Sequence, residues 1–221
     1  MSPHLVSLTM LCLVLAAIPA AAQYDNFGQG HYDNGPINGT TDAWTINFGY
    51  VVSDTFTGDG NYDRDFYFGV WEMPGDMMSS VQWSITSGEN SGTVYASGTA
   101  NGANLSDRFI STNQYDYNID VITVTNLNLQ TAYGTVYWLN LQNASVPSGD
   151  PVYWDENSGQ GCGGTDGKGA NCPSMASESA IGTIASEAFT IGSVGTPEPG
   201  SIVLFASGIL GLAGLLRRKL F

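Results

Sequence analysis

Phe66-Tyr-Phe-Gly-Val-Trp71 is a run in which large apolar side chains recur at every second position. Phe66, Phe68 and Val70 form one set, while Tyr67 and Trp71 belong to the other. Side chains of an extended chain alternate between two faces, so a period of two residues predicts a β-strand. No long stretch of the central sequence shows the 3.6-residue apolar period of an amphipathic helix.

The same alternation recurs along the chain between turn-rich segments. The predicted strands lie at 44–52, 66–71, 81–86, 94–96, 119–124, 136–141 and 189–191. In the first of them, every second residue from Trp44 to Val52 is apolar and would share one face. The strand at 119–124 has apolar residues in both sets, which predicts burial on both faces. About seven to nine short strands between Gly, Pro, Asn and Asp turns are typical of a β-sandwich or jelly roll.

The first 22 residues have the features of a cleaved signal peptide. Leu5 to Ile18 is apolar, and Ala20-Ala21-Ala22 supplies the small residues of a cleavage site before Gln23. An uncleaved N-terminal anchor is the alternative, although the apolar run is short for a membrane span. The mature body would be one domain over residues 23–195, which is long enough for a hydrophobic core.

Residues 196–221 form a tail of three parts. Pro197-Glu198-Pro199 is a stiff break, because both prolines have a fixed φ and lack an amide donor. Residues 201–216 are uncharged and mostly apolar, and a helix of roughly 24 Å would nearly span a hydrocarbon core of about 27–30 Å. The basic residues that follow would stay cytoplasmic, so the body would lie outside. A buried C-terminal core helix is the alternative.

This tail resembles the bacterial PEP-CTERM sorting signal. Pro197, Glu198 and Pro199 match its motif, and Arg217, Arg218 and Lys219 match its basic cluster. The resemblance covers about an eighth of the chain and implies transport: a membrane protease, exosortase, would remove the transmembrane helix 201–216. The body would then pass to the cell surface or the extracellular matrix.

The body is similar to ectodomains that often precede this sorting tail. The similar segments are 70–75, 137–143, 152–159 and 186–191. The resemblance implies one secreted β domain and transfers no functional residues. Residues 161–173, with two cysteines, are an insert relative to those ectodomains.

The body is strongly acidic. The chain has 20 Asp and Glu against 6 Lys and Arg, and outside the tail the basic residues are Arg64, Arg108 and Lys168. This balance argues against nucleic acid as a partner, because phosphate binding needs a basic surface. It also argues against docking on anionic lipid. It suits an extracellular protein that meets divalent cations, while solubility alone is the plainer explanation.

Cys162 and Cys172 are the two cysteines of the predicted body. In an oxidising compartment they are expected to form a disulfide that closes a short loop. A zinc site is not expected, because two cysteines with no nearby histidine cannot supply four ligands.

Asp59-Gly-Asn-Tyr-Asp-Arg-Asp65 is the one calcium-like run of the sequence. Its oxygen ligands would be Asp59, Asn61, Asp63 and Asp65, which follow the alternating start of a calcium loop. The pattern then departs from an EF-hand, since Arg64 and Val70 occupy the positions of its Gly and its bidentate Glu. A polar hairpin loop is the alternative.

Aromatic side chains beside carboxylates make a carbohydrate-binding module an alternative function. The candidate residues are Trp71, Trp83, Tyr153 and Trp154. This hypothesis requires exposed aromatic rings. The alternative is that the same residues form the end of a strand with a buried tryptophan and a polar turn. A jelly-roll glycosidase is a further alternative that needs two facing carboxyl groups about 5–9.5 Å apart. Asp155 and Glu156 would not supply them, because neighbours on a strand point in opposite directions.

No catalytic residue is assigned from the sequence. A histidine-dependent triad would rest on His31 alone, since His4 lies in the predicted signal peptide. The sequence therefore predicts a non-catalytic, surface-sorted β-sandwich in the cell envelope or exopolysaccharide matrix. Exosortase and the membrane are its expected partners, exopolysaccharide is a further one, and calcium is the one ion that the sequence suggests.

Overall fold

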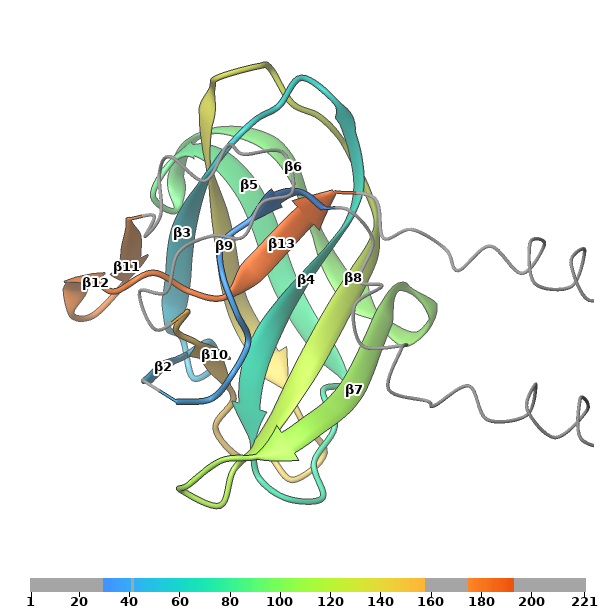
Figure 1. Ribbon diagram of the computed structural model, residues 1–221, viewed down its shortest axis with the longest axis vertical. Helices are drawn as coiled ribbons and strands as arrows, with labels where there is room; N and C mark the ends of the chain where they lie inside the picture. The colour runs from blue at the N-terminus through green and yellow to red at the C-terminus, as the bar shows by residue number, and fades with distance from the viewer. Residues whose placement is uncertain (1–29, 41, 158–174, 193–221) are drawn as a thin grey trace, which may run out of the picture. The chain divides into compact units, whose positions relative to one another are not determined.

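The computed structural model describes residues 30–40, 42–157 and 175–192, which belong to one compact unit spanning Gly28–Val194. These residues form two antiparallel sheets and one 3₁₀ turn, η2 (Gly102–Asn104) (Figure 1). The predicted all-β class is confirmed, and the two sheets are consistent with a β-sandwich. Within the same ranges, no helix is long and apolar enough to cross a membrane.

Several predicted features fall outside the described residues. They are the signal peptide, the sorting motif with its apolar segment and basic cluster, and the cysteine pair Cys162 and Cys172. These features remain predictions from the sequence.

The first sheet is organised around one long central strand, β4 (Tyr62–Glu72). One edge of β4 pairs with β8 (Asn118–Gln130), which in turn pairs with β7 (Leu105–Thr112). Two strands pair with the other edge of β4, namely β13 (Phe189–Gly192) and β10 (Tyr153–Asp155). Beyond them, β1 (Gly30–Asp33) pairs with β13, and β2 (Ala43–Thr45) pairs with β10.

The second sheet has six strands in the order β12, β11, β3, β9, β5 and β6. Their bounds are β12 (Gly182–Ile184), β11 (Ala176–Glu178), β3 (Val51–Thr57), β9 (Val136–Ser145), β5 (Ser80–Gly88) and β6 (Ser91–Asn101). Pairings such as β3 with β9 join segments far apart in the sequence, so the turns alone do not determine the order of the strands.

The core lies between the two sheets, because aromatic rings from facing strands meet there. Phe66 of β4 meets Trp83 of β5 edge-on, with ring centroids 5.7 Å apart. Phe56 of β3 meets Phe189 of β13 in the same way at 6.5 Å. Both pairs join one sheet to the other, and buried aliphatic side chains fill the space around them.

The prediction that residues 119–124 are buried on both faces is confirmed. Ile119 and Val121 on one face and Ile122 and Val124 on the other are all buried. Part of the outer cover comes from the chain around Gly39, which has φ +65°. A Cβ at Gly39 would lie 2.4 Å from Ile119 Cδ1, so glycine permits this close approach.

The single strand predicted over residues 44–52 is wrong. β2 ends at Thr45 and β3 begins at Val51, with a turn between them in which the Tyr50 amide donates to the Asn47 carbonyl at 3.0 Å. Phe48 has φ 56° and Gly49 has φ 88°, which an extended strand does not allow. The alternation of apolar residues therefore continues through a turn, where it does not indicate a strand. Phe48 accordingly lies 63% exposed and not on a buried strand face.

Candidate functional site

Three carboxylates meet on the core-facing side of the first sheet. They are Glu72 at the end of β4, Asp107 in β7 and Asp120 in β8, and one oxygen from each lies within 4.8 Å of the others. Glu72 continues the buried series of Phe66, Phe68 and Val70 along one face of its strand. An acid therefore stands where the alternation places an apolar side chain.

The strand register brings these carboxylates together. Asp120 lies opposite Val70 of β4 and opposite Phe109 of β7. Glu72 and Asp107 are each two residues from those partners, so both are diagonal neighbours of Asp120 on the same face. We call Glu72, Asp107 and Asp120 the carboxylate cluster.

Few hydrogen bonds reach the carboxylate cluster. The Met78 amide donates to Asp107 Oδ2 at 2.6 Å, which holds the loop after β4 against β7. Glu72 is 0% exposed, yet no amide or hydroxyl group donates to either of its carboxylate oxygens, nor to Asp120 Oδ2. The one polar partner of Glu72 is the carboxyl group of Asp107, to which it donates when protonated. Because buried polar atoms are nearly always hydrogen-bonded, three such oxygens in one cluster single out this site.

Burial and mutual repulsion perturb all three acids. Burial first, and then the charges of Asp107, Asp120 and Asp76, raise the pKa of Glu72 from 4.5 to about 9. Burial followed by the charge of Asp107 raises the pKa of Asp120 to about 7. Burial also raises the pKa of Asp107. The bare cluster therefore holds protons at neutral pH that a bound cation would displace.

The chemistry of the carboxylate cluster matches a hard cation. Carboxylate oxygens are the ligands of Ca²⁺ and Mg²⁺, whereas structural zinc sites use sulfur and imidazole nitrogen. Among the residues that the structure describes, this is the acidic group whose ligand atoms converge closely enough to hold a metal ion. The cluster is thus the candidate metal centre.

The calcium-like run of the sequence has a different structure. Asp59 accepts from the Asn61 amide at 2.8 Å, which closes a local turn. Asp63 and Asp65 lie within β4, where Asp63 is buried and Asp65 accepts from the Asn126 amide at 3.3 Å. Since the chain enters a strand here instead of wrapping around an ion, the converging geometry of a calcium loop is lacking.

The predicted saccharide-binding tryptophans lie in the interior. Trp154 is 0% exposed, Trp71 6% and Trp83 8%, while Tyr153 is half-buried. The Trp154 indole donates to the Ala188 carbonyl at 3.1 Å, and the Trp71 indole donates to Asp155 Oδ1 at 2.6 Å. These three side chains offer no open ring face, so the sugar-binding assignment of the tryptophans is corrected to a packing role.

A second group of buried acids surrounds Asp54 of β3. Asp54 Oδ2 accepts from Asn34 Nδ2 at 2.8 Å, Ser186 Oγ at 2.9 Å and the Glu187 amide at 2.7 Å. Burial nevertheless raises the pKa of Asp54 from 3.8 to about 8. Glu187 is buried with both oxygens lacking a donor, and its pKa is raised by burial and then by Asp54. This group stores protons in the core.

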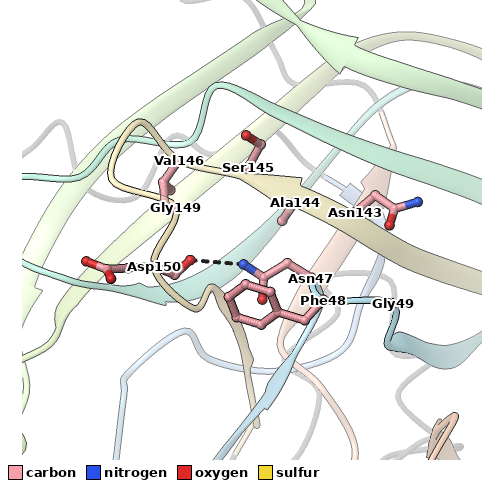
Figure 2. A pocket seen from close by; sticks show the side chains of 9 residues that line it. All are labelled: Asn47, Phe48, Gly49, Asn143, Ala144, Ser145, Val146, Gly149 and Asp150. Atoms are coloured by element: carbon pink, nitrogen blue, oxygen red, sulfur yellow. Dashed lines mark hydrogen bonds between the residues drawn. The ribbon is translucent and has the colours of Figure 1, made fainter.

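A surface pocket of about 330 Å³ lies between the turn at 47–49 and the end of β9 with the loop that follows (Figure 2). Asn47 Nδ2 donates to the Asp150 carbonyl at 3.0 Å, while Asn47 Oδ1 is buried without a donor. The exposed ring of Phe48 lies beside Asn47. The pocket is lined by Asn47, Phe48, Gly49, Asn143, Ala144, Ser145, Val146, Gly149 and Asp150.

The fold and these sites define an acidic all-β domain with a buried carboxylate cluster and a separate surface pocket. No family model matches the chain, and no curated protein matches it. The function is therefore inferred from the residues of the chain and their arrangement.

Proposed function

We propose that this chain is an exported, surface-sorted protein without catalytic activity, built on a jelly-roll-like β-sandwich. Its place would be the cell envelope or the exopolysaccharide matrix. The placement of the acids supports the non-catalytic role. The cluster of Glu72, Asp107 and Asp120 is packed between strands, whereas Asp150 is the single carboxylate that lines the pocket. A glycosidase needs two facing carboxyl groups that its substrate can reach.

Export and sorting are supported by the two ends of the sequence. The apolar run before Ala22 has the composition of a signal peptide, and Pro197-Glu198-Pro199 precedes an apolar segment and a basic triplet. Exosortase would cleave the tail after the chain has crossed the membrane, and the acidic body would remain outside.

Sorting predicts a processed C-terminus. Replacement of Glu198 by alanine, or deletion of residues 217–219, is expected to leave the tail attached and the protein in the membrane fraction. The wild-type chain should lose the tail and reach the surface fraction. Cell fractionation and mass spectrometry of the C-terminal peptide measure both outcomes. Glu89→Ala, on an exposed turn of the body, is the matched control. A surface-released wild-type protein that still ends at Phe221 would contradict the proposal.

A second candidate function, saccharide binding, is favoured by the pocket around Phe48. Phe48 is exposed, and its backbone has a positive φ, which is a strained conformation for a residue other than glycine. Such backbone strain is concentrated at functional sites. The side chains of Asn143 and Ser145 line the pocket and can hydrogen-bond to hydroxyl groups, and the Phe48 ring offers an apolar face. A volume of about 330 Å³ suits one sugar ring. The chemistry favours a neutral saccharide, since Asp150 would repel an anion.

Phe48→Gly tests this second function without disturbing the fold. Glycine adopts the positive φ of this position freely, so stability should stay the same or rise, while the aromatic face is lost. We expect retention of the cell's own exopolysaccharide in a pull-down to fall roughly tenfold, which is about 1.4 kcal/mol. Tyr133→Ala removes an exposed ring elsewhere and should leave retention unchanged. Equal retention by wild type and Phe48→Gly would end this candidate.

A further inference from the structure

We propose that Glu72, Asp107 and Asp120 form a calcium site that ties β4, β7 and β8 together within the sandwich. The proposal goes beyond the function given above, and the chemistry of the site does not depend on how the chain is sorted. It stands on the geometry of the carboxylate cluster, on its unpartnered oxygens and on the kind of ligand that it offers.

The spacing of the three carboxylates fits one ion. Oxygens bound to the same Ca²⁺ lie about 2.3–2.6 Å from it, so any two of them are at most about 5 Å apart. One oxygen each from Glu72, Asp107 and Asp120 already meets that limit, since all lie within 4.8 Å of one another. Three acids on three strands therefore converge as ligands do, without rearrangement of the backbone.

The unpartnered oxygens are the second, independent observation. Glu72 is 0% exposed, is aimed into the cluster and receives no hydrogen bond from an amide or hydroxyl group, and its one polar partner is the carboxyl group of Asp107. Asp120 Oδ2 is also buried and has no hydrogen-bond donor. In its ionised form, a carboxylate buried in this way loses its hydration and gains little in return, which opposes folding. A bound cation satisfies these oxygens and cancels the repulsion between the acids at once.

The ligand set selects calcium among common ions. All three ligands are hard carboxylate oxygens, so zinc and copper, which favour nitrogen and sulfur, are poorly matched. Mg²⁺ demands regular octahedral geometry and keeps several of its waters, which suits a fully buried Glu72 badly. Ca²⁺ accepts irregular geometry and bidentate carboxylates, and Glu72 has both oxygens available.

The ion would also fix a loop. The Met78 amide donates to Asp107 Oδ2 at 2.6 Å, so the segment after β4 is already attached to one of the proposed ligands. In the same segment, Asp76 Oδ2 accepts from Ser148 Oγ at 2.5 Å, which extends the connection to the loop after β9. Calcium is therefore expected to order the end of the sandwich at which β4 ends.

The test compares melting temperatures of the full-length chain in mild detergent, first in EGTA and then with Ca²⁺ or Mg²⁺ added. Ca²⁺ at about 100 times its dissociation constant should raise the melting temperature by roughly 5–11 °C, and Mg²⁺ by less. Glu72→Gln and Asp120→Asn should abolish the rise. In EGTA these variants should melt at or above the wild type, because each amide keeps the shape of the protonated acid and cannot become a buried charge.

A matched control separates this site from the acidic run of the sequence. The double variant Asp59→Asn and Asp65→Asn should keep the full calcium response. Loss of the response in this control, with retention in Glu72→Gln, would overturn the proposal. Equilibrium dialysis of wild type with radioactive calcium needs no variant to fold, and about one tightly bound ion per chain is expected. No retained calcium together with an unchanged melting temperature would likewise overturn it.

Discussion

Trp154→Ala lowers the free energy of unfolding by about 3–5 kcal/mol, the range for a large aromatic removed from a packed core. Trp154 is 0% exposed and packs edge-on against Phe68 at 5.9 Å and Phe189 at 5.7 Å. The variant also leaves the Ala188 carbonyl without the indole donor at 3.1 Å. Both the cavity and the lost hydrogen bond act in the same direction.

Denaturant unfolding of the full-length chain measures this effect, and the melting temperature should fall by roughly 6–20 °C at about 2–4 °C per kcal/mol. Ile181→Ala is the control, because Ile181 is 65% exposed and its loss should change stability by less than about 0.5 kcal/mol. A Trp154→Ala protein with wild-type stability and a selective loss of polysaccharide binding would instead support the saccharide hypothesis from the sequence.

The calcium-free protein becomes less stable as the pH rises from about 5 to 8. Burial raises the pKa of Asp54 from 3.8 to about 8, so between these values the folded chain holds a proton that the unfolded chain has released. The stability that this proton supplies is fully present below pH 4 and is lost as the pH approaches 8. Each such group lowers the free energy of unfolding by up to about 1.4 kcal/mol per pH unit.

Asp54→Asn isolates the contribution of this group. Asp54 faces Glu187 and the polar side chains of Asn34 and Ser186. The negative charges that also raise the pKa of Glu187 are those of Glu156, Asp155 and Asp42. The carboxylate cluster titrates in the same direction, so the informative quantity is the difference in slope between wild type and variant. Melting temperatures in EGTA at several pH values should show a shallower fall for Asp54→Asn. Identical slopes would show that Asp54 does not hold the proton.

The fold class is predictable because apolar residues recur with a period of two along the longer strands. The run at 66–71 lies within β4, and both faces of 119–124 are buried. The period fails where a turn keeps the alternation by chance, as at Phe48, whose positive φ is invisible in the sequence. β7 is missed because its residues are mostly polar, and its extended form depends on pairing with β8.

The candidate metal centre is not predictable from local spacing. Glu72, Asp107 and Asp120 are single acids in three strands, and only the register of β4, β7 and β8 brings them together. One signal was available, since Glu72 continues the inward face of Phe66, Phe68 and Val70. The run at 59–65 has the spacing of a calcium loop, but it leads into a strand, which separates its oxygens.

The saccharide hypothesis shows the same limit of local pattern. Trp154 stands beside Asp155 and Glu156, a composition shared by sugar sites and by buried strand ends. β10 is only three residues long, and it lies between β4 and β2. Its burial follows from these neighbouring strands and not from its own amino-acid sequence.

Crystals of the full-length chain grown with calcium, followed by an anomalous difference map at a wavelength where calcium scatters, give the most direct test of the central claim. One peak is expected among Glu72, Asp107 and Asp120, about 2.3–2.6 Å from an oxygen of each. Three well-ordered carboxylates with no peak between them, or a peak at Asp59 to Asp65 instead, would contradict it.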